Sequence, residues 1–555
     1  MIMNNILKGF ALTAAVLGCA ACDFLDMTPT DSVSDKVMWE NTKNAEWAVN
    51  SIYSYIYDVT EDQSVVGLTE SLTDIMKYGS YNYNSMALIP SEFAYGDATT
   101  ITASYVNAYM GYWGDQYNRV RRTNEALNNL HKYGKMSDAD KLRLEAELRF
   151  MRGFLYFDLV KRYKEIIIYD ENMEAITKDK ALSTEKEAWD FIQADLDFAA
   201  ANLPAKADAS GRLDKGSAYA FLTRAMLYAG RYEAVIAAAD EVKALGYKLE
   251  DKYADAYSKS VPAGNTEAIL QYQFSRAENI THSFDYYYTP GGDFSLNKSQ
   301  GGGYGTPTQE LVESYELATG GKPDWEPWHA EDVTDTPPYA SLEPRFHATV
   351  LYNGADWKGR KIEPWLGGDD GYCEWNAEPE PNGRSTTGYY LRKMVDETHD
   401  VIKYSTGVQP ITIIRYAEVL LNKAEALYMT GKEAEAETII NGDIRARVGL
   451  PGISAEGDEL MAAIRQERKV ELAFEGLWYW DLRRWGIAHK AYPEGLTGYQ
   501  VHGFKITKDE DGVFHYSYIS VDDKNRNFSE KLYRFPLPSD ELNNNGLVSQ
   551  FPEWK

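Results

Sequence analysis

Two glutamates one helical turn apart, Glu471 and Glu475, have a spacing that could serve acid–base chemistry. On one helix their Cβ atoms would lie about 6 Å apart, close to the carboxyl separation of retaining glycosidases. Side chains one turn apart point the same way, however, so they cannot flank a glycosidic bond from opposite sides of a sugar ring. With Arg468 and Arg465 nearby, the pattern favours a structural ion-pair network.

Other catalytic signatures are missing from the sequence. The eight histidines include no His-Glu-x-x-His pair, and neither a Gly-x-Ser-x-Gly elbow nor a phosphate-binding Gly-x-x-x-x-Gly-Lys loop occurs. The glycine-rich residues 301–305 miss the dinucleotide fingerprint, because Thr306 stands at the third glycine. The sequence therefore predicts a protein that is not an enzyme. Catalytic carboxylates without a motif stay open, since 84 acidic residues leave many pairs that the sequence does not rank.

Aromatic residues in predicted loops are the candidates for ligand binding. Aromatic rings stack on the apolar C–H faces of sugars, while the sugar hydroxyls bond to nearby polar groups. The chain has 41 Tyr and 13 Trp against 19 Phe, an excess of aromatics with polar tips. For each candidate the alternative is that the ring packs its loop onto the scaffold. The predicted ligand contacts are Tyr78, Tyr81 and Tyr83 in the first long loop, and Trp325, Trp328 and Trp375 further along the chain.

Composition limits the partners. The 555 residues carry a formal net charge of −27, which argues against nucleic acid or an anionic membrane surface, because both require clustered Lys and Arg. An uncharged ligand is the simpler interpretation. No cofactor is predicted; whether the acidic loops hold a structural Ca²⁺ stays open, and no metal site can be assigned.

The first residues predict export and lipidation. Lys8 precedes an apolar run over residues 9–17, which is shorter than the ~20 residues of a membrane-spanning helix. Two cysteines follow, Cys19 and Cys22. We predict that residues 1–21 are a lipoprotein signal peptide and that Cys22 accepts the lipid, with Cys19 as the alternative. Only Cys373 remains, so no disulfide framework supports the fold.

Helical periodicity dominates both halves of the chain, in residues 117–130, 142–163, 215–245, 414–440 and 460–485. Two of these stretches carry similar segments, AMLYAG at 225–230 and ALYMTG at 426–431. In each, small residues allow close helix packing and a glycine ends the first helix, which indicates a tetratricopeptide-like helix pair. The copies lie about 200 residues apart, so the repeat is scattered around a long insertion rather than tandem.

The remaining segments predict loops and one hairpin. An insertion over residues 261–405 is rich in Gly, Pro, Tyr and Trp and shows little helical period. Alternating residues 503–506 and 513–518 flank an Asp-Gly turn, which predicts a β-hairpin. We therefore expect one mostly α domain over residues 22–555: a helical scaffold at 36–260 and 406–490, the insertion as ligand-binding region at 261–405, and a hairpin with C-terminal segment at 491–555.

Several segments, in order along nearly the whole chain, resemble the RagB/SusD family of outer-membrane lipoproteins. The most specific is IRQERKVELAFEG at 464–476, continuing to residue 486; Glu343 stands where the family more often has Asp. The resemblance at Cys22 is the reason for preferring that cysteine. The other matching segments are CDFLD at 22–26, IRYAEVLLNKAEA at 414–426, EPRF at 343–346 and LYRFPLP at 532–538.

The resemblance implies a right-handed tetratricopeptide superhelix that holds ligand loops on one face. It also implies a noncatalytic, lipid-anchored protein on the exterior of the outer membrane, which captures an oligosaccharide or polysaccharide for a SusC-like TonB-dependent transporter. Two alternatives stay open: a surface receptor for peptide cargo, and a protein-interaction scaffold without its own ligand site. Which glycan and which transporter are involved does not follow from the sequence.

Overall fold

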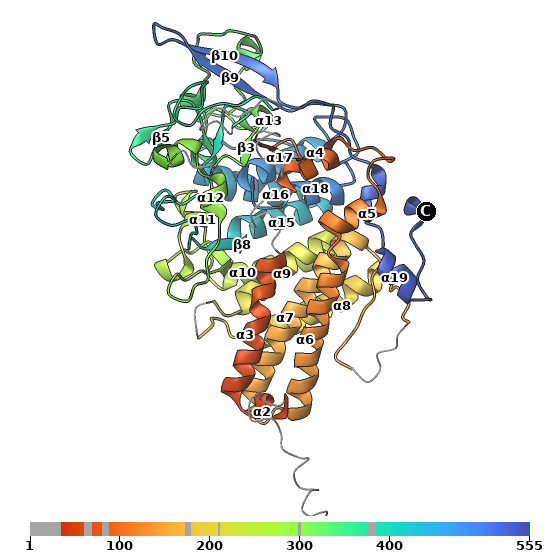
Figure 1. The fold of residues 1–555 in the computed structure, drawn as a ribbon. Helices are drawn as coiled ribbons and strands as arrows, with labels where there is room; N and C mark the ends of the chain where they lie inside the picture. Colours follow the sequence, from red (N-terminus) through yellow and green to blue (C-terminus); the bar gives the residue numbers. More distant parts are fainter. Residues whose placement is uncertain are drawn as a thin grey trace, which may run out of the picture.

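The computed structural model describes residues 35–59, 69–79, 88–172, 179–208, 211–297, 301–375 and 385–555. Helices dominate these residues and the strands are short, so the predicted mostly α class is confirmed. Long helices form one end of the molecule, and the hairpin β9–β10 and loop-rich segments form the other (Figure 1). None of the described helices is long and apolar enough to cross a membrane.

The N-terminal helices pack around α7, Asp138–Tyr163, whose side chains are buried on nearly every face of its second half. Capping fixes where these helices begin: Ser137 accepts from the Asp140 amide at 3.1 Å, and Thr184 forms a capping box with Glu187. Helix α7 packs against α3, α6 and α8. The bounds are α2 Asp35–Trp39, α3 Thr42–Val59, α6 Trp113–Tyr133 and α8 Glu185–Asn202.

The two similar segments form the predicted helix pairs. One pair is α9, Lys215–Tyr228, with α10, Tyr232–Ala244; the other is α15, Tyr416–Met429, with α16, Glu433–Ile439. Gly230 and Gly431 both have left-handed backbone, with φ of 68° and 77°, which a side chain would strain. Helix α10 packs against α15, so the two copies lie side by side despite their distance in sequence.

The insertion leaves the scaffold and returns through one strand pair. Strand β2, Ala268–Tyr272, pairs antiparallel with β8, Ile411–Arg415. Between them the chain forms turns, short helices and two- or three-residue strands around an apolar core, which Met76, Phe474 and Phe504 from outside the insertion also join. The short elements in and next to the insertion are α11 Asp255–Ser258, α12 Phe284–Tyr288, β3 Gly305–Pro307, α13 Gln309–Val312, α14 Pro344–Thr349, β4 Val350–Leu351, β5 Asp356–Trp357, β6 Arg360–Lys361 and β7 Tyr390–Leu391.

The predicted single helix over residues 460–485 is wrong. The structure has α17, Gly457–Glu471, and α18, Trp478–Arg484, with a sharp connection between them. In the connection, Phe474 and Gly476 take positive φ values of 65° and 72°, so the chain cannot continue there as a right-handed helix. The apolar residues recur at helical spacing across both helices and the connection, so periodicity alone did not show the break between them.

The hairpin is confirmed: β9, His502–Lys508, pairs antiparallel with β10, Phe514–Ser520. Gly512 has φ of 83° in its turn, and Asp509 accepts from the Val513 amide at 2.8 Å. The C-terminal segment then returns to the scaffold, where the Phe535 amide donates to the Arg162 carbonyl at 2.9 Å. It carries one further α-helix, α19, Ser539–Asn544.

Candidate functional site

A hollow of about 590 Å³ opens beside two short helices, α4, Leu88–Tyr95, and α5, Ala103–Val106. Its volume lies in the ~300–1,000 Å³ range of small-molecule sites. Segments far apart in the chain meet there. The described residues that line it are Ser91, Glu92, Tyr95, Gly96, Thr100, Ile101, Tyr105, Trp375, Asp523 and Lys524.

One wall of the hollow is the segment that joins α4 to α5. Asp97 accepts from the backbone amides of Thr99 and Thr100 at 2.8 and 3.0 Å, which orders the turn and places Thr100 at the hollow. A hydrogen bond from the Thr99 hydroxyl, and then these two amide bonds, hold the pKa of Asp97 below its usual value. Thr102 then begins α5 by accepting from the Tyr105 amide at 3.2 Å.

Tyr105 presents its ring to the hollow from α5. The ring lies 4.8 Å from that of Phe93, centroid to centroid, and so is held from behind by α4. Burial, and a hydrogen bond to the Glu92 carboxylate, raise the pKa of Tyr105. The hydroxyl therefore stays protonated and can donate to a carboxylate or to a ligand oxygen.

The opposite wall is Trp375, which is 7% exposed. Its indole Nε1 donates to Asp523 Oδ2 at 3.1 Å. Tyr78, on β1, Met76–Tyr78, packs against the Trp375 ring, and β1 pairs antiparallel with β3. The tryptophan is thus placed by a strand from the first part of the chain and by a carboxylate that follows β10.

Beneath this wall lies the buried side chain of Lys77. Its Nζ atom is 3.6 Å from the centroid of the Trp375 ring, 2.7 Å from Asp522 Oδ1 and 2.8 Å from the Tyr95 hydroxyl. The Tyr95 hydroxyl also donates to Asp522 at 2.8 Å. Burial raises the pKa of Tyr95, and the Asp522 charge adds to the effect. Tyr95 and Trp375, two of the aromatic side chains that line the hollow, therefore contact one buried ion pair, Lys77–Asp522.

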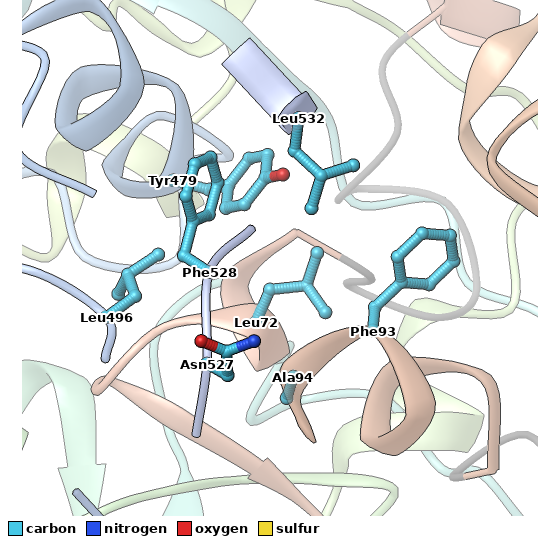
Figure 2. A pocket seen from close by; sticks show the side chains of 8 residues that line it. All are labelled: Leu72, Phe93, Ala94, Tyr479, Leu496, Asn527, Phe528 and Leu532. Carbon is cyan, nitrogen blue, oxygen red and sulfur yellow. The ribbon is translucent and has the colours of Figure 1, made fainter. Parts of the chain in front are cut away.

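Smaller cavities lie on the inner side of α4. One, of about 10 Å³, is lined by Leu72, Phe93, Tyr479 and Phe528 among others. Figure 2 shows these side chains from close by, with Asn527 among them. A second, of about 10 Å³, lies near Lys77 and Arg526. Each has room for about one water molecule and none for a sugar ring. Of these three cavities, the outer hollow is the one that can accept a ligand.

The predicted ligand residues separate into three groups. Trp375 lines the hollow, whereas Tyr78 packs against Trp375, is only 2% exposed and does not line the hollow. Tyr81 and Tyr83 lie outside the described residues, as do Cys19 and Cys22.

Trp325 and Trp328 belong to another part of the insertion. Trp325 is 5% exposed and packs against Tyr339 and Trp328, with ring centroids 6.4 and 6.1 Å away. Trp328 donates from Nε1 to the Asp335 carbonyl at 3.0 Å. Neither tryptophan lines the hollow. A ligand contact by either stays a prediction, for a site separate from the hollow.

Sequence reasoning missed Tyr95, Tyr105, Asp523 and Lys524. The predicted ligand contacts were aromatics in loops, whereas Tyr95 ends one short helix and Tyr105 lies in another. The available signal was their position: both flank the polar turn over residues 96–102. Asp523 and Lys524 directly follow the predicted hairpin, where a return of the chain to the scaffold could have been expected.

The Glu471 and Glu475 carboxylates are structural, as expected, but the predicted partners are wrong. Glu471 binds Arg415 at 2.7 Å, and also Arg447, while Glu475 binds Arg415 at 2.6 Å. Burial alone would raise the pKa of Glu471, but the surrounding guanidinium groups outweigh it and hold the pKa far below its usual value.

The arginines named in the sequence prediction have other partners. Arg468 forms two hydrogen bonds with Asp481, at 3.0 and 3.1 Å, and the Arg465 guanidinium lies 4.9 Å from the centroid of the Trp485 ring. Across the described ranges, no group of three or more His, Cys, Asp and Glu side chains is arranged to hold a metal ion. Calcium binding, which the sequence leaves open, stays untested.

Comparison with known proteins decides the family. The model of the SusD family matches residues 266–554, and a second model, described as starch-binding and associating with the outer membrane, matches residues 23–227. The chain belongs to the SusD family. A SusD-like protein of Formosa agariphila is 24% identical over 88% of this chain and 93% of its own length. A SusD-like protein of Bacteroides ovatus is 23% identical over 94% of this chain and 90% of its own length.

Solved structures agree with this assignment. A crystal structure of a SusD-like protein from Bacteroides fragilis superposes with a TM-score of 0.77 at 28% identity, covering 95% of this chain and 99% of that one. A laminarin-binding SusD-like protein superposes with a TM-score of 0.60 at 22% identity, covering 93% of this chain and 100% of that one. This likeness shows that the two proteins share a fold. The predicted SusD-like scaffold is therefore confirmed.

Proposed function

We propose that this SusD-family protein is a cell-surface glycan receptor that binds an oligosaccharide or polysaccharide in the hollow beside α4 and α5. It delivers the glycan to a SusC-like TonB-dependent transporter and catalyses no reaction itself. The observation that carries the proposal is the set of three aromatic side chains that line the hollow, Tyr95, Tyr105 and Trp375, beside hydrogen-bonding groups from Glu92 and Asp523. Sugars require this combination of apolar ring faces and polar edges.

The comparisons support the ligand class. One matching family model is described as starch-binding, and one structural neighbour is a laminarin-binding protein. Both glycans are neutral. Among the charged residues of the hollow, Glu92 and Asp523 outnumber Lys524, which favours a neutral glycan over a polyanionic one.

We further propose that a lipid on Cys22 anchors the protein to the outer membrane, facing the cell exterior. The outer-membrane description of the matched family model supports the location. Replacement of Cys22 by Ala should abolish labelling with a radioactive fatty acid, and Cys19→Ala should not. Retention of label in the Cys22 variant with loss in the Cys19 variant would assign the lipid to Cys19.

Binding is tested by electrophoresis of the soluble protein, begun after Cys22, in native gels that contain starch, laminarin, xylan or mannan. We expect at least one glycan to retard the wild type and Trp375→Ala to lose most of the retardation. Trp328→Ala tests the alternative site, because it removes a partly buried tryptophan that does not line the hollow, and the proposal expects this variant to be retarded as the wild type is. Thermal unfolding of all three proteins checks that they fold.

Each outcome has a defined meaning. Equal loss in the Trp375 and Trp328 variants would place binding elsewhere or reveal a general defect. Loss in the Trp328 variant alone would move the site to the insertion core around Trp325. No retardation of folded wild type by any polysaccharide would contradict the glycan receptor and favour peptide cargo or a scaffold without a ligand site.

A further inference from the structure

Lys77 is a buried cation that no ligand in the hollow could reach directly. It is 3% exposed and sits on β1, behind the walls rather than among the lining residues. Its ammonium group contacts Trp375, Tyr95 and Asp522, which come from three separate segments of the chain. A single ammonium group therefore contacts both Trp375 and Tyr95, two aromatic side chains that line the hollow.

The groups that face this ammonium leave it little freedom. Asp522, which follows β10, also accepts from Arg526 Nε at 2.8 Å and from the Val501 amide at 2.9 Å, so the carboxylate is fixed. Asp523 adds negative charge and Arg526 positive charge near Lys77, and Tyr95 faces it from α4. Thr306, opposite Lys77 on β3, is uncharged.

We propose that Lys77 is a positioning residue of the ligand site, whose ammonium charge fixes the Trp375 and Tyr95 rings in their ligand-binding orientation. The inference rests on the proposed function of the hollow. Rings held rigidly before binding lose little conformational freedom when a sugar stacks on them, so affinity is higher. The cation–π contact with Trp375 and the charge-assisted hydrogen bond to Asp522 both require a protonated amine.

The charge state of Lys77 can be changed within an accessible pH range. Burial lowers the pKa of Lys77 to about 8, against the opposing attraction of Asp522. Raising the pH above 8 therefore removes the charge in the folded protein. Glycan affinity should fall over the same range.

The fall in glycan affinity above pH 8 cannot result from unfolding caused by the deprotonation of Lys77. The pKa is lower in the folded chain than the ordinary 10.5, so between about pH 8 and 10.5 the unfolded chain binds more protons. In this range the free energy of unfolding rises with pH through this group. Binding and stability are thus expected to change in opposite directions.

A second buried lysine provides a matched control. Lys469 Nζ lies 2.7 Å from Asp74, and the same carboxylate accepts from Trp478 Nε1 at 2.8 Å, so this cluster has the same three residue types. Lys469 is 8% exposed and does not line the hollow. Lys469→Met therefore reproduces the loss of a buried lysine–aspartate pair without touching the site.

The experiment measures affinity for starch, laminarin, xylan and mannan between pH 7 and 9.5, for wild type, Lys77→Met and Lys469→Met. At pH 7 we expect Lys77→Met to bind about tenfold more weakly than wild type, as for the loss of one important contact, and its affinity to be independent of pH. Wild type and Lys469→Met should bind equally at pH 7 and should both weaken above pH 8. Melting temperatures at each pH accompany the titrations.

Three results would overturn the positioning role: wild-type affinity in folded Lys77→Met, a fall with pH that persists in that variant, or a wild-type affinity that stays constant up to pH 9.5. If Lys77→Met does not fold, the pH profiles of wild type and Lys469→Met still decide, because a constant profile contradicts the proposal. Absence of any binding by folded wild type at pH 7 would overturn the glycan receptor itself. Failure of the positioning role alone leaves wild-type binding at pH 7 intact.

Discussion

The hollow and the core of the insertion are built from the same residue types but differ in what surrounds the rings. Trp325 in the insertion core lies among Tyr339 and Trp328, and its indole Nε1 is buried without a hydrogen-bond partner among the described residues. Trp375 at the hollow lies against the Lys77 ammonium and donates to Asp523. An aromatic ring among other rings serves packing, whereas a ring fixed by charges beside open space can serve binding.

The two regions also attach to the scaffold differently. Arg345, on α14 of the insertion, enters the scaffold and binds Glu467 of α17 at 2.7 Å and Glu343 at 2.6 Å, fully buried. The hollow instead is formed by segments that converge on Lys77 and Asp522. Loss of the first attachment should therefore affect folding, and loss of the second should affect binding.

The largest expected effect tests the attachment of the insertion. Arg345→Met leaves the buried Glu343 carboxylate without its cation, and should lower the free energy of unfolding by about 3–5 kcal/mol. Burial already raises the pKa of Glu343 in the intact protein. Urea unfolding provides the measurement.

The control for that variant is Arg392→Met, since Arg392 pairs with Glu397 elsewhere in the insertion with both side chains partly exposed. Its effect should stay below about 1 kcal/mol. Comparable losses from the two variants would contradict the special role of the buried attachment.

Truncation of the insertion core comes next. Trp325→Ala should cost about 3–5 kcal/mol of stability, because it leaves a cavity between Tyr339 and Trp328. Glycan affinity of the folded fraction should not change, in contrast to Trp375→Ala. Urea unfolding and the native-gel panel on the same preparations check both statements, and a selective loss of binding in Trp325→Ala would remove the distinction between the regions.

The smallest expected effect is a pH dependence confined to the insertion. A hydrogen bond from His399 Nδ1 to Asp285, 2.7 Å long, raises the pKa of His399. The folded pKa lies above the unfolded value, so this stabilisation is complete below pH 6.5 and is lost as pH rises through the folded pKa. We expect at most about 1 kcal/mol.

His282 lies nearby and has a pKa shift of the opposite sign, since burial lowers its pKa. The contribution of His399 is therefore measured as a difference: thermal unfolding of wild type minus His399→Gln between pH 5.5 and 8. A difference that does not shrink with rising pH would contradict the assignment. The two regions are thus expected to differ in pH range: the insertion loses the contribution of His399 as pH rises above 6.5, and Lys77 behind the hollow loses its charge near pH 8.

Much of the scaffold follows from local patterns. The AMLYAG and ALYMTG segments predicted two helix pairs because small residues and a terminal glycine act within a few residues of each other. The hairpin followed from alternation around Asp509 and Gly512 for the same reason. The break between α17 and α18 did not follow, because the apolar residues keep their spacing through the connection, and the left-handed backbone of Phe474 and Gly476 is seen only in the structure.

The site was predictable only in part. The sequence alone determined the helical class and the family, because periodicity and motifs are local properties. Tertiary structure decided that Trp375, Tyr95 and Tyr105 line the hollow, whereas Trp325 packs in a core. It also decided that Lys77 meets Asp522, 445 residues away. Such contacts depend on how distant segments pack, and no spacing within one segment encodes them.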